Sequence, residues 1–297
     1  MSNMGFKGFY KVLIHSGDEN KPKRVVDWFP NLITNLGLNA HANQADVAQY
    51  IRLGSSSQTP AASDTGLINP FSAAITGVVD GIGNSTTIPY YSWLRKKYRF
   101  DPGQAVGNAS EVSVSYSSSN TQAYSRALIT EEGSPITITI LPEDYVTIYY
   151  ELRLYADTED HTGTVNINGN EHTYRIRPCN LGSWNFSYHS HMLTQHLYYC
   201  TVYTGSLGAV TQLPSGNQAG FHIASHSQFL PYVSDSFEHK FNFTIPIQNC
   251  NLVGGIRSMV ISNYMHAFQV EFDPPIPKTD QNTLTMSFKY KWGRAQI

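Results

Sequence analysis

Six histidines in the second half of the chain are the residues best suited to metal chemistry. His189 and His191 are two positions apart, so in a β-strand both imidazoles would point to one face, as a Zn²⁺ site requires. His196 could add a third ligand, but no HExxH or CxxC spacing is present. Histidine beside Tyr and Trp is also typical of contact surfaces, and we favour that interpretation and expect no cofactor. The remaining histidines of this group are His222, His226 and His239.

Motifs for nucleophilic, phosphate-binding or paired-acid chemistry are missing from the sequence. It contains no GxSxG elbow, no P-loop and no GxGxxG turn after a strand. A glycosidase needs two carboxylates about 5 to 10 Å apart, and no pair can be singled out among the scattered acids. Glu151 and Arg153 alternate on one strand face, which favours cross-strand charge pairs. We therefore expect the chain not to be an enzyme.

Aromatic residues interleaved with small polar residues form the second pattern of interest. The chain has 19 Tyr and 14 Phe. In protein and glycan contact surfaces, rigid rings supply area and small polar side chains supply hydrogen bonds. The alternative is that alternate residues of these runs fill a second β core. The candidates for contact with a receptor are Trp184, Phe186, Tyr188, Tyr198, Tyr199 and Tyr203.

The charge content excludes several classes of protein. Charged residues make up 14% of the 297 residues, against roughly 25% in typical soluble domains. Lys and Arg number 20 and Asp and Glu 22, a net charge of −2. The only dense basic run is Arg95–Arg99, so we expect no nucleic-acid partner. The composition also argues against a coiled coil and against a disordered tail.

Cysteine content and apolar runs bear on where the protein folds. Cys179, Cys200 and Cys250 can form at most one disulfide, and we favour three reduced, packed thiols. No run approaches 18 apolar residues, so we expect no membrane insertion. The first residues have no apolar stretch typical of a secretory signal, which leads us to expect folding in a cytoplasm.

The strand pattern predicts an all-β fold. About a dozen candidate strands follow one another with little helix between them, as in an antiparallel β-sandwich of the jelly-roll type. The sequence Asn168-Gly169 between two alternating runs predicts a hairpin. One short N-terminal helix is expected over residues 31–42, with Leu32, Leu36 and Ala40 on one face. We expect neighbouring subunits to hold the long loops at 54–62 and 205–220.

Two domains are expected, although the boundary signal is weak. The first, residues 1–158, combines a hairpin, the short helix and several strands. The second, residues 159–297, is a β-sandwich that carries the aromatic and histidine-rich insertion. A single interleaved domain is the alternative.

Several short motifs resemble segments of structural proteins of tailed bacteriophages. They cover most of residues 26–155 and part of the C-terminal region, whereas residues 160–248 diverge. In that group the matching proteins are tail, collar or fibre components. The motifs are Asp27–Leu38 (DWFPNLITNLGL), Ile51–Gly54, Thr59–Leu67 (TPAASDTGL), Tyr98–Phe100, Gly107–Val112 (GNASEV), Tyr124–Ile129 (YSRALI), Pro135–Leu141, Tyr150–Tyr155, Phe272–Thr279 (FDPPIPKT) and Trp292–Arg294.

The resemblance implies a non-enzymatic subunit of a virion that is assembled in the host cytoplasm. Such a subunit would associate through β interfaces with itself, as a trimer or ring, and with other tail, baseplate or neck proteins. The residues implied in docking onto the particle are Trp28, Phe29, Asn31, Leu32 and Leu36. Two alternatives are a virion adhesin that binds a host receptor or glycan through its aromatic runs, and a protein that decorates the capsid.

Overall fold

The first strand described alternates between buried and half-buried residues from Met4 to Val12. In the computed structural model, which describes residues 2–43, 46–184, 199–223, 226–262 and 266–296, β1 covers Ser2–His15. Phe6, Tyr10 and Val12 are buried, and Lys7 and Lys11 lie half-buried on the opposite face. This alternation is the pattern of a strand with one face against a core.

β1 is central to an eight-stranded sheet because it pairs along both edges. β14 (Tyr145–Ala156) pairs antiparallel with one edge from Met4 to His15. The other edge is shared by β23 (Leu284–Arg294), which is parallel to β1, and by β2 (Arg24–Pro30), which is antiparallel to it. The strand order is β19-β20-β23-β1-β14-β7-β6. The remaining strands are β6 (Val78–Asn84), β7 (Tyr91–Phe100), β19 (Ser227–Phe229) and β20 (Glu238–Ile245).

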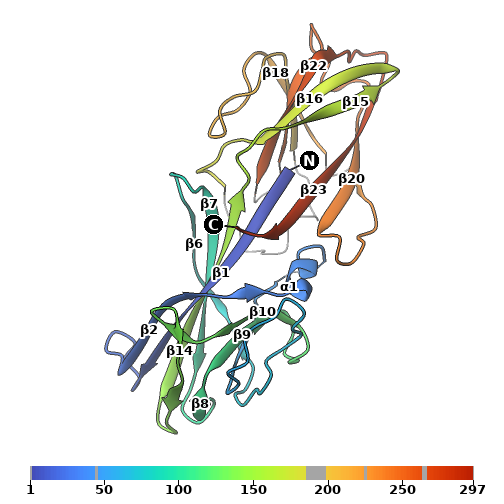
Figure 1. Ribbon diagram of the computed structural model, residues 1–297. Helices are drawn as coiled ribbons and strands as arrows, with labels where there is room; N and C mark the ends of the chain where they lie inside the picture. Colours follow the sequence, from blue (N-terminus) through green and yellow to red (C-terminus); the bar gives the residue numbers. More distant parts are fainter. Residues whose placement is uncertain (1, 44–45, 185–198, 224–225, 263–265, 297) are drawn as a thin grey trace.

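Two smaller sheets pack against the two ends of the large sheet. A five-stranded sheet, β3-β10-β9-β4-β5, lies against β1, where the Tyr10 hydroxyl is 2.8 Å from the Ser125 Oγ. A six-stranded sheet, β15-β16-β22-β21-β17-β18, lies against β20 and β23, where the rings of Phe268 and Tyr290 are 6.0 Å apart. Figure 1 shows an elongated molecule with two lobes. The first lobe contains the five-stranded sheet and the second contains the six-stranded sheet, and β1 extends from one toward the other.

The strands of the five-stranded sheet are shorter than most strands of the six-stranded sheet. The first consists of β3 (Leu32–Ile33), β4 (Tyr50–Gly54), β5 (Ile75–Thr76), β9 (Glu111–Ser115) and β10 (Ala123–Leu128). The second consists of β15 (His161–Ile167), β16 (Asn170–Pro178), β17 (Tyr199–Tyr203), β18 (Gln218–His222), β21 (Ile256–Ser262) and β22 (Ala267–Ile276). Two-stranded pairs are formed by β11 (Thr130–Glu131) with β12 (Ser134–Pro135), and by β8 (Gly107–Ala109) with β13 (Ile138–Ile140).

The all-β prediction is confirmed, with one difference in strand direction. Strand pairs are antiparallel except for β1 and β23, so the large sheet is mixed. The hairpin of β15 and β16 turns at Asn168 and Gly169, whose φ angles of 53° and 86° explain the preference for Asn-Gly. Because β23 pairs with β1, one sheet contains strands from both sides of residue 158; the division at that position stays a prediction.

The predicted helix is shorter than expected. α1 covers only Asn35–Ala40, and Leu32 belongs to β3, which pairs with β10. The Thr34 hydroxyl accepts a hydrogen bond from the Gly37 amide at 2.9 Å, so Thr34 is the N-cap and the helix cannot begin earlier. Leu38 and Ala40 are buried, whereas Leu32 and Leu36 are half-buried, so the expected apolar face is wrong.

Two further segments form strands despite their composition. Residues 67–85, which are rich in small residues, contain β5 and β6. β22 extends through the prolines at 274 and 275 to Ile276, which pairs with Ile256. Pro274 and Pro275 lie beyond the part of β22 that pairs residue by residue with β16, so their missing N–H groups cost no hydrogen bond to that strand.

Buried histidine and cysteine side chains lie in the core of the second lobe. The three cysteines are unpaired and buried, which agrees with the expectation of free thiols. The His266 ring lies 4.7 Å from that of Tyr290 and 5.3 Å from that of Phe268. Burial lowers the pKa of His266 from 6.5 to about 3, because an imidazolium would lose its hydration there.

We expect acid to destabilise the protein through His266. His266 binds a proton near pH 6.5 in the unfolded chain and only near pH 3 in the folded chain. The contribution of neutral His266 to the free energy of unfolding is therefore full above pH 6.5 and decreases as the pH falls below 6.5. The slope is about 1.4 kcal/mol per pH unit. Denaturant unfolding between pH 7.5 and 4.5 should show a smaller loss for His266→Phe than for the wild type. The half-exposed His161 provides the control: His161→Asn should keep the wild-type slope, and equal slopes for all three proteins would contradict this assignment.

Candidate functional site

Three of the sequence motifs quoted above, at 59–67, 107–112 and 124–129, meet at one buried arginine. Arg126 on β10 is fully buried, and its Nε donates to Glu111 Oε2 at 2.8 Å. Its two terminal nitrogens donate to Asp64 Oδ2 at 2.8 Å and to the Gln58 carbonyl at 2.7 Å. Arg126, Glu111, Asp64 and Gln58 are called the arginine node below. A planar guanidinium needs several acceptors in fixed directions, and here each edge of the group has one.

The arginine node holds the long loop that follows β4. The Glu111 carboxylate also accepts hydrogen bonds from the amides of Asn69 at 2.9 Å and Ile68 at 3.3 Å. Asp64 accepts from the Ala61 amide at 2.9 Å. The loop is therefore held by its own chain, and its contact with a neighbouring subunit stays a prediction. Sequence reasoning missed the node because its members are far apart along the chain.

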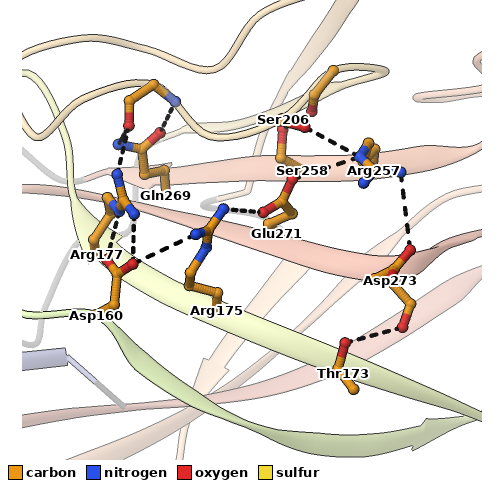
Figure 2. Close-up of polar contacts among 12 residues, drawn as sticks. Asp160, Thr173, Arg175, Arg177, Ser206, Arg257, Ser258, Gln269, Glu271 and Asp273 are labelled. Carbon is orange, nitrogen blue, oxygen red and sulfur yellow. Dashed lines mark hydrogen bonds and ion pairs between the residues drawn. The ribbon is translucent and has the colours of Figure 1, made fainter.

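The second long loop is also held by its own sheet (Figure 2). Gln269 on β22 is fully buried, and its Oε1 accepts from the Gly208 amide at 2.9 Å. Its Nε2 donates to the carbonyls of Gly208 at 3.1 Å and Ala209 at 3.2 Å. The Ser258 hydroxyl donates to the Gly205 carbonyl at 2.7 Å. Residues 205–209 are therefore anchored without a partner subunit.

Charged residues cover the sheet face beside this loop. Figure 2 shows Arg175 between Asp160 and Glu271, with Arg257 approaching Glu271 from the other side. Burial alone would raise the pKa of Glu271, but hydrogen bonds from Arg175 and Ser206 hold this pKa below its usual value. Arg177 donates to Asp160 through Nε and one terminal nitrogen, and to the Gly208 carbonyl through the other terminal nitrogen. The set is a paired, partly exposed network, and its members already satisfy one another.

The outer face of the large sheet, opposite the five-stranded sheet, carries a different arrangement. Register places Phe9 of β1 opposite Glu151 of β14, and Glu151 opposite Arg95 of β7. One pair farther along, Arg153 lies opposite Trp93. Trp28 of β2 joins them over Arg95. The arginine–aromatic face is defined by Phe9, Trp28, Tyr91, Trp93, Arg95, Glu151 and Arg153.

Guanidinium groups on this face lie over aromatic rings and share one carboxylate. The Arg95 guanidinium carbon is 5.1 Å from the Trp28 ring centroid and 5.0 Å from that of Trp93. The Arg153 guanidinium carbon is 4.4 Å from the Phe9 centroid and 4.7 Å from that of Tyr91. Cation–π contacts of this kind hold both partners in place.

Glu151 binds the two arginines of this face together. Its Oε2 accepts from Arg95 at 2.7 Å and its Oε1 from Arg153 at 2.7 Å. The predicted cross-strand charge pairing of Glu151 is therefore confirmed. Two glycines of β6 lie beneath the Trp93 ring, since a Cβ at Gly83 would come within 2.7 Å of the indole. The face is preorganised by these contacts.

A polar groove adjoins the arginine–aromatic face, between the β1–β2 hairpin and β6. Its volume is about 490 Å³. The lining residue Glu19 forms an ion pair at 2.6 Å with Lys97, which lies outside the lining. Burial alone would raise the pKa of Glu19, but the hydrogen bond from Lys97 lowers it. The residues that line the groove are Lys11, Leu13, Glu19, Asn20, Pro22, Val25, Trp28, Asp80, Arg95 and Tyr149.

The structure separates the residues predicted to dock onto a particle. Trp28 is 38% exposed on the outer face, whereas Phe29 is buried against Tyr10. The Asn31 side-chain amide donates a hydrogen bond to the Ser125 Oγ at 2.8 Å, so it is used within the chain. Leu32 and Leu36 are half-buried, as described above. Of the five, Trp28 presents the largest exposed side chain, and Phe29 cannot contact a partner.

The predicted receptor contacts fall into three groups. Trp184 is buried, with its Nε1 donating to the Cys179 carbonyl at 2.9 Å, and Tyr203 is buried beside Val260, so their positions do not fit a receptor-contact role. Tyr199 is 40% exposed and remains a candidate. The others, Phe186, Tyr188 and Tyr198, lie outside the described residues, as do the predicted metal candidates His189, His191 and His196.

Comparisons with protein families, curated proteins and solved structures find no match for this chain. Within the described ranges, no group of three or more His, Cys, Asp and Glu side chains is arranged to hold a metal ion. No helix found in those ranges is long and apolar enough to cross a membrane.

Neutralising one carboxylate of the arginine node should destabilise the protein strongly. Glu111→Gln leaves the buried Arg126 charge poorly compensated, and we expect a loss of about 3 kcal/mol in the free energy of unfolding. Cleavage by a protease within residues 55–69 should also accelerate. The exposed pair of Arg24 and Glu131 is the control, because Glu131→Gln should cost less than about 1 kcal/mol. Similar losses for both variants would show that the node does not stabilise the fold.

Replacing Gln269 should release the second loop. Gln269→Leu removes the acceptor of the Gly208 amide and both donors to the loop, and we expect a cost of about 1 to 3 kcal/mol. Hydrogen exchange at Gly208 should accelerate while exchange in β16 changes little. The exposed Gln281 supplies the matched substitution Gln281→Leu, which should leave the Gly208 amide protected. Unchanged protection in Gln269→Leu would refute the anchoring role.

Proposed function

We propose that the chain is a non-enzymatic structural subunit of a tailed-bacteriophage particle. It would assemble with copies of itself, as a trimer or ring, and with neighbouring tail, baseplate, collar or fibre proteins, and would be located in the virion. A jelly-roll type of sandwich is the fold expected with this proposal. The observation that carries it is the direct contact between motifs that are far apart in the sequence.

The N-terminal and C-terminal motifs meet in the structure. The Trp292 Nε1 donates to the Leu38 carbonyl at 2.8 Å, and the Arg294 Nε donates to the Ile33 carbonyl at 2.6 Å. Arg294 also donates to Asn35 Oδ1 at 2.7 Å. These residues belong to the motifs of residues 27–38 and 292–294. Chance matches would have no reason to contact one another, so the contact supports the resemblance.

Other motif residues have structural partners as well. Arg126, Glu111 and Asp64 build the arginine node. The buried Lys278 donates to Asn251 Oδ1 at 2.7 Å and to the Ile247 carbonyl at 3.1 Å. The hydrogen bonds of these side chains anchor loops of the same chain. This arrangement favours a role as a structural subunit over a role in catalysis.

The alternatives concern the position and task of the protein on the particle. An adhesin that uses the aromatic runs loses the support of Trp184 and Tyr203, because both are buried. A capsid decoration protein would have the same kind of framework, and the symmetry of its copies distinguishes it from a tail component.

Purified particles produced from the genome that encodes the chain should contain it in stoichiometric amount. We expect mass spectrometry to find its peptides and image reconstruction to place copies with three-, six- or twelve-fold symmetry at the tail or neck. Native mass spectrometry of the isolated protein should show a trimer or ring. Particles free of the protein would contradict the proposal, and copies spread over the head would favour decoration.

A further inference from the structure

We infer that the polar groove beside Trp28 binds a neutral oligosaccharide. No catalytic step is attached to this site, and the inference does not depend on the virion role proposed above. Three properties of the groove carry it: its size and openness, its balanced charge, and the indole at its edge.

The groove has room for a small chain of polar rings. Its volume of about 490 Å³ lies within the range of ligand sites, roughly 300 to 1,000 Å³. The floor is a sheet surface: register sets Lys11 of β1 opposite Tyr149 of β14, and Arg95 of β7 lies two residues farther along, opposite Glu151. The hairpin residue Glu19 and the β6 residue Asp80 line it as well. An extended ligand fits such an open site better than a compact apolar one.

The charges that line the groove balance one another. Lys11 and Arg95 are cations, and Glu19 and Asp80 are anions. The charged groups paired with them from outside the lining keep this balance: Asp27 binds Lys11 at 3.1 Å and Lys97 binds Glu19 at 2.6 Å. A phosphate, an acidic peptide or a polyanionic glycan would meet as many anions as cations. Hydroxyl groups, by contrast, donate to carboxylates and accept from ammonium and guanidinium groups, so a neutral sugar can bind beside these ion pairs without adding a charge.

Trp28 provides the apolar surface that sugar rings need. Its side chain is 38% exposed and Arg95 lies 5.1 Å from its centroid, so the indole is held in place while part of it faces solvent. The C–H face of a pyranose can pack on such a ring, and the ring loses little freedom when it binds. The Glu151 carboxylate fixes Arg95 from below through a bond of 2.7 Å. The site is therefore preorganised, which reduces the entropic cost of binding.

Binding can be tested on the isolated protein with a printed array of neutral, sialylated and phosphorylated oligosaccharides. We expect binding to neutral members, followed by a measurable affinity in calorimetric titration with the best of them. Trp28→Ala should weaken that affinity at least tenfold. Asp80→Asn preserves the shape of an exposed β6 side chain and should weaken the affinity for the oligosaccharide at least threefold. This second variant tests the site even if Trp28→Ala disturbs the fold. The melting temperature of each variant is measured in parallel.

The exposed Ile247 supplies the control, because Ile247→Ala trims a comparably exposed apolar side chain far from the groove, in the loop that follows β20. Its affinity should equal that of the wild type. A protein that binds no array member, that prefers acidic glycans, or that keeps full affinity in Trp28→Ala and Asp80→Asn would overturn the inference. None of these results affects the particle test, so failure of one proposal can be told from failure of the other.

Discussion

A guanidinium group that is removed from water must find acceptors in the directions that its N–H groups impose, and Arg126 does so by gathering segments from across one lobe. Glu111 comes from the adjacent strand, whereas Asp64 and the Gln58 carbonyl come from the loop between β4 and β5. The sheet and the loop therefore depend on each other. Burial of the Arg126 guanidinium is compensated only when the loop supplies its acceptors, and the hydrogen bonds from Arg126 in turn order the loop. The smaller sheet of the first lobe takes its shape from this requirement.

The second lobe reaches a similar result without a buried ion pair. The side-chain amide of Gln269, on β22, forms hydrogen bonds with the backbone of residues 208 and 209. These bonds provide partners both for the polar backbone groups of the loop and for the buried amide of Gln269. Uncharged hydrogen bonds of this kind do not require burial of a net charge, but an amide left alone in the same place would be costly. Both lobes thus order long connections internally, and this leaves their outer faces available for other tasks.

Local chemistry explains which parts of this structure could be predicted from the sequence. The strand that carries Glu151 and Arg153 and the turn at Asn168-Gly169 depend on neighbours along the chain, and both were predicted correctly. The helix was overestimated because the stripe of Leu32, Leu36 and Ala40 has the right spacing, while the cap at Thr34 and the pairing of Leu32 with Arg126 prevent an earlier start. The groove at Trp28 could not be foreseen, since it joins β1, β2, β6, β7 and β14 through register. Burial of Trp184 depends on β22, about eighty residues away.

The parallel pairing of β1 with β23 has a consequence for synthesis. Ser2 of β1 is synthesised 288 residues before Tyr290, its partner in β23. Until then this length of strand offers unpaired backbone groups to any other chain nearby, a known hazard for association of nascent proteins. The large sheet therefore cannot be completed until β23 has been synthesised, and this edge of β1 is open to such association until then.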